Sequence, residues 1–207
     1  MPVVVIIDYD AGNIKSVEKA FEYLGERVLI TRDTQEIYRG DHVVLPGVGA
    51  FGDAMKRIRS YGLEDVIKEV ARREVPFLGI CLGQQLLFDY SEESDNVSGL
   101  GILRGGIVRI PDEDEDSNRY KVPQIGWNNL KLSGDGRLFK GIEGEPYVYF
   151  VHSYYLKAEN RSIVKATCDY SVRIDASVES GNVFACQFHP EKSSEVGMQI
   201  LRNFLAV

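Results

Sequence analysis

One cysteine and one histidine with an acidic neighbour supply the reactive side chains of this chain. Cys81 lies in the stretch Gly79-Ile80-Cys81-Leu82-Gly83, directly after an apolar run, and His189-Pro190-Glu191 follows late in the chain. A Gly-x-nucleophile-x-Gly stretch after a strand predicts a sharp turn into a helix, because glycines let the two backbones approach closely. We expect Cys81 to stand exposed at the helix start, where free amide N–H groups and the helix dipole favour a thiolate.

A nucleophilic cysteine needs a base, and the base needs a group that orients it. His189 has the residue type of the base, and Glu191 has that of the orienting acid. These types and their order predict a cysteine-nucleophile enzyme with a Cys81–His189–Glu191 triad. Two plainer interpretations stay open: Cys81 as a small buried core residue, and His189 as a satisfied histidine at the end of a strand. The glycines on both sides of Cys81 disfavour the first.

The elements that would position these residues alternate between strand and helix in the first half of the chain. Apolar runs predict strands at 3–7, 28–31, 43–45 and 77–80, and apolar periodicity predicts helices at 13–24, 54–60 and 63–73. From about residue 107 short strands follow, at 107–110, 129–132, 147–151, 154–158, 163–168 and 183–188, before a helix over 194–205. This order predicts a single α/β domain over residues 1–207. It would have a mostly parallel central sheet flanked by helices, and extra antiparallel strands in the second half.

The turn around Cys81, called the elbow below, and the His-x-Glu stretch together resemble the class I (triad) glutamine amidotransferases. Within that class the chain is similar to the glutaminase subunits of imidazole glycerol phosphate synthase, from histidine biosynthesis. The stretches that carry this likeness are Tyr9-Asp10-Ala11-Gly12-Asn13, Pro46-Gly47-Val48-Gly49, Pro123-Gln124-Ile125-Gly126-Trp127-Asn128, Phe150-Val151-His152-Ser153-Tyr154-Tyr155 and Lys192-Ser193. They extend from the first predicted strand to the last helix, so nearly the whole chain is covered.

An oxyanion pocket would be needed to hydrolyse a glutamine side chain through a thioester. One donor is expected from the N–H of Leu82, the residue after the nucleophile. The second is expected from the loop at 46–50, which follows the third predicted strand at the active edge of the sheet. The resemblance implies that the Gly47–Val48 peptide of this loop can turn. It also implies that glutamine is contacted by Gly49, Gln85, Ser153 and Tyr154.

A partner is also implied by the resemblance, which places Asn13, Trp127 and Lys192 at the interface with a barrel-shaped cyclase subunit. Tryptophan is a favoured interface anchor, although Trp127 could equally be a packing aromatic. Two alternatives to this function stay open. One is a class I glutaminase of another pathway, such as pyridoxal phosphate, anthranilate or purine synthesis. The other is a non-catalytic scaffold that keeps the fold only to bind a partner.

Composition and charge narrow the remaining classes of function. The chain has 207 residues with 24 basic and 31 acidic side chains, a net charge of −7, and no clustered basic face for nucleic acid. No segment approaches the roughly 20 apolar residues of a membrane span, and three unpaired cysteines fit a reducing cytoplasm. The cysteines and the three histidines lack zinc-ligand spacing, so we expect no metal and no cofactor. Five acids at 112–116 predict a solvated hairpin tip.

Overall fold

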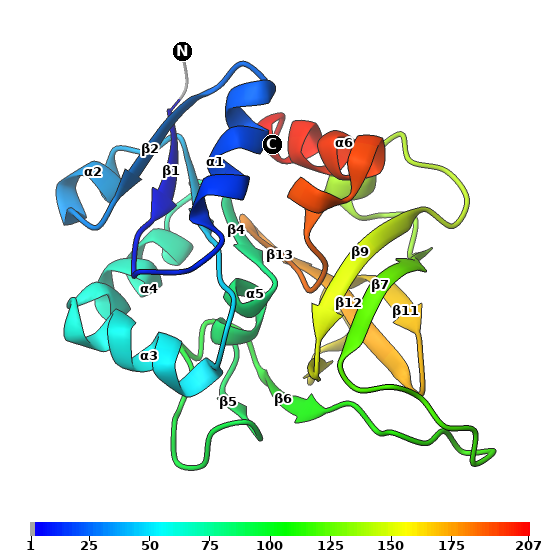
Figure 1. The fold of residues 1–207 in the computed structure, drawn as a ribbon. Coiled ribbons are helices and arrows are strands. Elements are labelled where there is room, and N and C mark those ends of the chain that lie inside the picture. The colour runs from blue at the N-terminus through cyan, green and yellow to red at the C-terminus, as the bar shows by residue number, and fades with distance from the viewer. Residues whose placement is uncertain (1–2) are drawn as a thin grey trace.

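The computed structural model describes residues 3–207, and its centre is an eight-stranded sheet. The strand order is β2-β1-β3-β4-β13-β12-β11-β8 (Figure 1). In that order the bounds are Arg27–Thr31, Val3–Ile7, His42–Leu45, Phe77–Ile80, Val183–Cys186, Arg173–Ser180, Val164–Asp169 and Lys131–Leu132. The first five strands pair in parallel and the last three in antiparallel fashion. The predicted mostly parallel α/β sheet with antiparallel additions is therefore confirmed.

Helices cover both faces of this sheet because successive side chains of its central strands point to opposite sides. In β1, Val4 and Ile6 join one core cluster with the helices α1 (Ile14–Tyr23) and α6 (Ser194–Leu205). Val5 and Ile7 join the other cluster, with α2 (Thr34–Tyr38), α3 (Phe51–Ser60) and α4 (Leu63–Arg72). Figure 1 shows α1 beside α6, and the rings of Phe21 and Phe204 lie 6.3 Å apart between these helices. The apolar run at 3–7 is therefore buried on both faces, as parallel strands are.

Two smaller sheets complete the second half of the chain. One contains β10 (Tyr154–Ala158), β6 (Gly105–Arg109) and β5 (Tyr90–Ser91), and the other pairs β7 (Gln124–Asn129) with β9 (Tyr147–His152). The connection from β6 to β7 projects from the body of the molecule (Figure 1). It carries the acidic run, where Glu113 bridges to Arg119, and most of its side chains are exposed. The expected solvated tip is confirmed.

Several predicted elements are wrong in detail. The strand expected at 129–132 is interrupted at the fully buried Leu130: β7 ends at Asn129, where the chain stops pairing with β9, and β8 joins the main sheet at Lys131. Residues 124–128 of β7 were not predicted as a strand.

Strand β12 was not predicted at all. Its sequence alternates apolar and polar residues from Arg173 to Glu179, a strand signal that was overlooked, and both faces are buried because Asp175 and Ser177 are buried as well. The structure satisfies Asp175 with the guanidinium of Arg161 and the N–H of Ala158.

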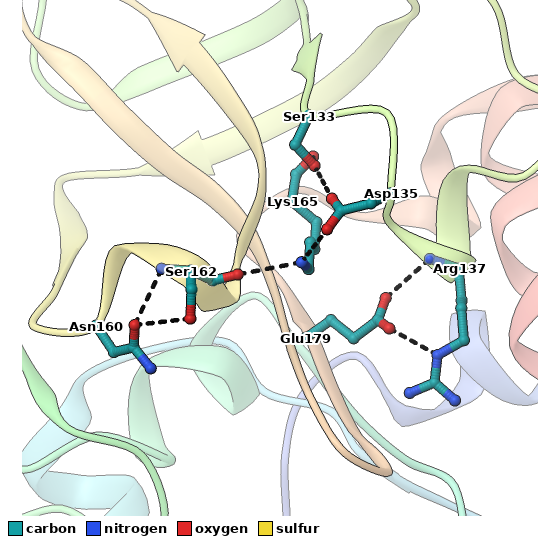
Figure 2. A network of polar contacts seen from close by, with 7 residues as sticks. All are labelled: Ser133, Asp135, Arg137, Asn160, Ser162, Lys165 and Glu179. Carbon is teal, nitrogen blue, oxygen red and sulfur yellow. Dashed lines mark hydrogen bonds and ion pairs between the residues drawn. The ribbon is translucent and has the colours of Figure 1, made fainter.

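The outer edge of the main sheet is secured by polar side chains (Figure 2). Lys165, on β11, donates to Asp135 Oδ2 at 2.7 Å and to the carbonyl of Ser162 at 3.1 Å. The backbone N–H and Nε of Arg137 donate to the two carboxylate oxygens of Glu179, on β12, at 2.8 and 2.6 Å. These bonds tie the turn around residue 135 to the antiparallel strands. Within residues 3–207, no helix is both long enough and apolar enough to cross a membrane.

Candidate active site

Strand β4 ends at Ile80 and helix α5 (Leu82–Leu86) begins two residues later, so Cys81 alone makes the turn. Its backbone has φ 55° and ψ −110°, a conformation that residues with a side chain rarely adopt. A Cβ atom on Gly79 would lie 2.8 Å from the Gly83 carbonyl oxygen, and one on Gly83 would overlap the carbonyl of Leu45. The two glycines are therefore required by close backbone approach, as the sequence predicted.

The thiol of Cys81 is not exposed as expected, because the residue is only 6% exposed. Neighbouring strand ends and loops close over the short helix and leave the nucleophile at the wall of a cavity of about 310 Å³. The residues that line this cavity are Val48, Gly49, Cys81, Leu82, Gln85, Glu93, Pro123, Val151, His152, Ser153 and Tyr154. All four residues expected to contact glutamine are among them, although they come from three separate parts of the chain.

His189 reaches the nucleophile because β13 lies beside β4 in the sheet, and the N–H of Cys81 donates to the carbonyl of Cys186 at 2.8 Å. The Nδ1 atom of His189 lies 2.7 Å from Glu191 Oε1, and both side chains are fully buried. Its Nε2 atom is buried and forms no standard hydrogen bond within residues 3–207. The arrangement leaves Nε2 free to exchange a proton with Cys81.

Electrostatics at His189 favour the charged ring. Burial lowers the pKa of His189, but the hydrogen bond with Glu191 and electrostatic interaction with Cys81 and Glu191 outweigh burial and raise this pKa above its ordinary value. The imidazolium form is therefore stabilised beside the sulfur. This is the form that can hold a thiolate and later donate a proton to a leaving group.

Asn13 contributes to this set in a way the sequence did not reveal. Its Nδ2 atom donates to Glu191 Oε1 at 2.5 Å and lies 3.4 Å from His189 Nδ1, and the residue is 9% exposed. One carboxylate oxygen thus faces both the histidine and the amide. The side chain that the resemblance places at a partner interface turns inward here, toward the histidine and its acid.

The expected oxyanion pocket is occupied by the loop that should help to form it. The N–H of Leu82 donates to the carbonyl oxygen of Gly47 at 3.2 Å. The Gly47–Val48 peptide therefore points its oxygen at the first donor instead of adding the second one. Of the two orientations implied by the resemblance, the structure has the one in which the pocket is blocked.

Neighbouring contacts hold this loop in place. The hydroxyl of Tyr9 donates to the carbonyl of Pro46 at 2.7 Å, and a Cβ atom on Gly47 would collide with the same hydroxyl. Gly49 has φ +98°, which a residue with a side chain would resist. Gly47 is thus needed because a side chain there would collide with Tyr9, and Gly49 is needed because of its positive φ.

Two residues at the site were missed by sequence reasoning. Glu93 lies in the turn after β5, and its Oε2 accepts the N–H of Phe51 at 2.7 Å. Gln187 is completely buried, and its Nε2 lies 3.7 Å from Cys81 Sγ. Residue type gave no signal for Glu93. For Gln187 a signal existed, because a residue two positions before His189 in an extended segment points to the same side.

The proposed interface residues differ in their surroundings. Trp127 is 52% exposed on β7, packed edge-on against Tyr149 of β9, and Lys192 is also exposed. Ile125 and Tyr147 on the same two strands are exposed as well. The β7–β9 pair therefore presents a group of large apolar side chains that the rest of the described chain leaves uncovered.

The remaining histidines and cysteines take structural places. His152 lines the cavity and bonds through Nδ1 to the Tyr154 carbonyl at 2.8 Å, and burial lowers its pKa to about 4. His42 is buried beside Phe204, and Cys168 and Cys186 are fully buried in strands. No group of three or more potential metal ligands occurs among residues 3–207.

Solved structures with the same fold include PurLQS from Thermotoga maritima, with a TM-score of 0.77 and 20% identity over 99% of this chain and 98% of that one. Another is a glutamine amidotransferase with a TM-score of 0.74 and 20% identity, covering 98% of this chain and 97% of that one. At this level of identity the likeness concerns the fold alone.

Closer relatives are found among curated sequences. The imidazole glycerol phosphate synthase subunit HisH of Bacillus thuringiensis (strain Al Hakam) is 47% identical over 206 residues, which cover 99% of this chain and 94% of the relative. The subunit HisH of Geobacillus sp. (strain WCH70) is 48% identical over 202 residues, or 98% and 95%. The family model "Glutamine amidotransferase class-I" matches residues 5–207. By these matches and by the geometry around Cys81, the chain belongs to the class I glutamine amidotransferase family.

Proposed function

We propose that this chain is the glutaminase subunit of imidazole glycerol phosphate synthase. It hydrolyses L-glutamine to glutamate and ammonia and passes the ammonia to a cyclase subunit, which makes imidazole glycerol phosphate and AICAR in histidine biosynthesis. The observation that carries this proposal is that Cys81, with the buried His189–Glu191 pair behind it, lines a cavity that also gathers the expected glutamine contacts. The close relatives named above support the pathway.

The reaction begins with attack of the Cys81 thiolate on the side-chain amide carbon of glutamine. A carbon–sulfur bond forms and the carbonyl oxygen becomes an oxyanion. The His189 imidazolium donates its Nε2 proton to the nitrogen, the carbon–nitrogen bond breaks, and ammonia leaves a thioester. The neutral imidazole then takes a proton from water, whose oxygen attacks the thioester, and glutamate and the thiolate are released. Glu191 holds Nδ1 throughout and so fixes the ring orientation.

The cavity offers groups for the other end of glutamine. The Glu93 carboxylate suits the α-ammonium group, because the pair is oppositely charged and partly shielded from water. Gln85, Ser153, Tyr154 and the Gly49 backbone supply hydrogen-bonding groups around the same space. With the substrate held at this end, its amide carbon would be positioned beside the sulfur.

Partner binding is proposed for the β7–β9 surface, with Trp127 as an anchor, and for the exposed Lys192, which follows the His-x-Glu stretch. The exposed Ile125 and Tyr147 support this, because large uncovered apolar groups mark interaction sites. We retain from the resemblance that the cyclase is barrel-shaped. Ammonia released into water would be protonated, so direct transfer into a docked partner is required.

We also propose that the chain works as one domain in the cytoplasm. Both core clusters combine side chains from the first and last strands of the main sheet, which supports one folding unit. Cys81, Cys168 and Cys186 are free thiols, which suits a reducing compartment.

The test is a coupled assay with the chain and its cyclase. We expect glutamine-dependent formation of imidazole glycerol phosphate with the chain present, and ammonium-dependent formation with the cyclase alone. A cyclase that used glutamine without this chain, or a chain that failed to support glutamine use, would contradict the proposal. An intact Cys81 site in a catalytically inert chain would instead favour the scaffold alternative.

A further inference from the structure

Gln187 is a buried polar side chain that the triad mechanism does not use. It has no exposed surface, and its backbone N–H donates to the carbonyl of Ala176 at 2.9 Å. Its side chain extends toward the sulfur of Cys81, with Nε2 at 3.7 Å from Sγ. A buried amide needs partners for its donors and its acceptor, so the contacts it makes identify its purpose.

The orientation of the Gln187 amide follows from its neighbours. The Tyr154 carbonyl can only accept a hydrogen bond, so the Gln85 atom 3.1 Å from it must be the donor Nε2. The same Gln85 Nε2 lies 2.9 Å from Gln187, which must therefore present its acceptor Oε1. The remaining end of the Gln187 amide is Nε2, and it faces the sulfur. The Tyr154 carbonyl thus fixes the orientation of the Gln85 amide, and Gln85 fixes that of Gln187. The result is an N–H donor aimed at Cys81.

The usual stabilisers of a thiolate are weak at this elbow. Helix α5 has five residues, so its dipole is short, and the N–H of Leu82 is already bonded to the Gly47 carbonyl. His189 supplies charge, but it is also the group that transfers protons during the reaction. An amide donor does not change its protonation state and can stay in place.

We infer that Gln187 is a further catalytic residue, whose Nε2–H donates to the Cys81 sulfur and stabilises it as a thiolate. The inference rests on the proposed role of Cys81 as the nucleophile. A thiolate is a much stronger acceptor than a thiol, so the donor favours the ionised form. The same bond stabilises the sulfur when it leaves the thioester as a thiolate. It also lowers the intrinsic reactivity of the thiolate, because nucleophilicity falls as thiolate stability rises.

The experiment follows the rate of Cys81 alkylation by iodoacetamide as a function of pH, with the modified residue quantified by mass spectrometry. Gln187→Met keeps the length of the side chain and removes the donor. We expect the midpoint of the pH profile to rise by about one pH unit, because one hydrogen bond to a charged group is worth that much. The plateau rate at high pH should not fall, and should rise slightly. A variant that only disturbed the fold would expose the buried Cys168 and Cys186 as well, so their alkylation would also rise.

Helix α5 offers a residue for a matched control. Gln84 is also fully buried, but its Nε2 donates to the Asp175 carbonyl at 3.3 Å and makes no hydrogen bond with Cys81. Gln84→Met should leave the midpoint unchanged. If Gln187→Met does not fold, Gln85→Met decides, because it frees the Gln187 amide to turn and should raise the midpoint by a smaller amount.

Equal midpoints in the wild-type chain and in Gln187→Met would overturn the inference, as would an equal shift in Gln84→Met. Failure of the proposed function looks different. In that case Cys81 of the wild-type chain would show no faster alkylation than Cys168 or Cys186, and glutamine would not protect it. Protection by glutamine together with an unchanged midpoint would leave the nucleophile assigned and remove Gln187 from catalysis.

Discussion

The backbone conformation of Cys81 is strained, and this strain lowers the stability of the folded chain. With φ 55° and ψ −110°, the residue lies in a region where a Cβ atom is crowded, and such conformations cost of order 1–3 kcal/mol. The cost persists because β4, α5 and the two flanking glycines enforce the turn. Strain here presents the sulfur to the cavity, so stability is sacrificed for geometry.

We expect Cys81→Ala and Cys81→Gly both to abolish glutamine hydrolysis, but to differ in stability. Alanine keeps the Cβ atom and its strain, whereas glycine removes both. After allowing for the greater freedom of glycine in the unfolded chain, Cys81→Gly should be more stable than Cys81→Ala by about 1 kcal/mol. Chemical unfolding of the two variants measures the difference. Ammonium should still support the cyclase in both cases, and glutamine-dependent product from either variant would refute the nucleophile assignment.

Replacing the acid should cost less activity than replacing the base. Glu191 orients the ring through Nδ1, whereas His189 transfers the proton itself, so Glu191→Gln should retain more kcat than His189→Ala. The amide oxygen of the introduced glutamine could still accept from Nδ1, which preserves part of the orientation. Steady-state kinetics in the presence of the cyclase provide the comparison. A larger loss in Glu191→Gln would contradict the roles given to the two residues.

His152 makes stability depend on pH. Burial lowers its pKa to about 4, so between pH 6.5 and pH 4 the unfolded chain binds a proton that the native chain excludes. Stability should therefore fall as the pH falls through this window, by roughly 2 kcal/mol from this residue between pH 6.5 and 5. Unfolding by urea at several pH values measures the slope, and His152→Gln should flatten it. An equal slope in that variant would exclude His152 as the cause.

Among individual residues, the sequence predicted those whose type alone suggests chemistry. Cys81, His189 and Glu191 were found from the elbow and from the His-x-Glu spacing. Asn13, Glu93 and Gln187 were not assigned to the site. Their places depend on contacts between segments distant in sequence, such as the bond from Asn13 to Glu191, and no local pattern encodes such a contact.

Among the elements, the loop between β3 and α3 decides whether the oxyanion pocket exists. Turning the Gly47–Val48 peptide by about 180° changes ψ of Gly47 and φ of Val48. Val48 now has a negative φ and would acquire a positive one, which a β-branched residue strongly resists. Val48 therefore biases the loop toward the blocked orientation in which the Gly47 carbonyl takes the Leu82 N–H.

We expect Val48→Gly to raise kcat of the isolated chain by about tenfold, because relief of roughly 1.4 kcal/mol would favour the open orientation by that factor. Val48→Ala is the matched control, since it removes the branch but keeps a Cβ atom that resists positive φ. Initial-rate assays with saturating glutamine, without the cyclase, give the comparison. If the glycine and alanine variants were equally active, backbone strain would not control the loop.

Strong periodicity made some elements predictable to the residue. The strand at 77–80 and the helix at 194–205 were placed at their observed bounds, because each buries a continuous or regularly spaced apolar set. Short helix α2 was missed, since five residues hold too little periodicity. It is fixed instead by the Asp33 side chain, which accepts the N–H groups of Gln35 and Glu36.

For the whole molecule, the blocked pocket implies control by the partner. A cyclase that binds the open orientation more tightly would shift the population, by no more than its differential affinity for the two states. We expect little glutaminase activity from the chain alone. Addition of the cyclase with its nucleotide-like ligand should raise kcat more than it lowers KM, because the missing donor acts in the transition state. Full activity of the isolated chain would indicate a free-standing glutaminase.

The seam between β4 and β13 has a further consequence during synthesis on the ribosome. Cys81 leaves the exit tunnel directly after β4, whose neighbour β13 begins only at Val183, about 100 residues later. A nascent chain therefore carries the thiol long before it carries the base, and until His189 is added it lacks the proposed triad. Until β13 has been made, β4 has an unpaired parallel edge, and such edges favour pairing with other strands.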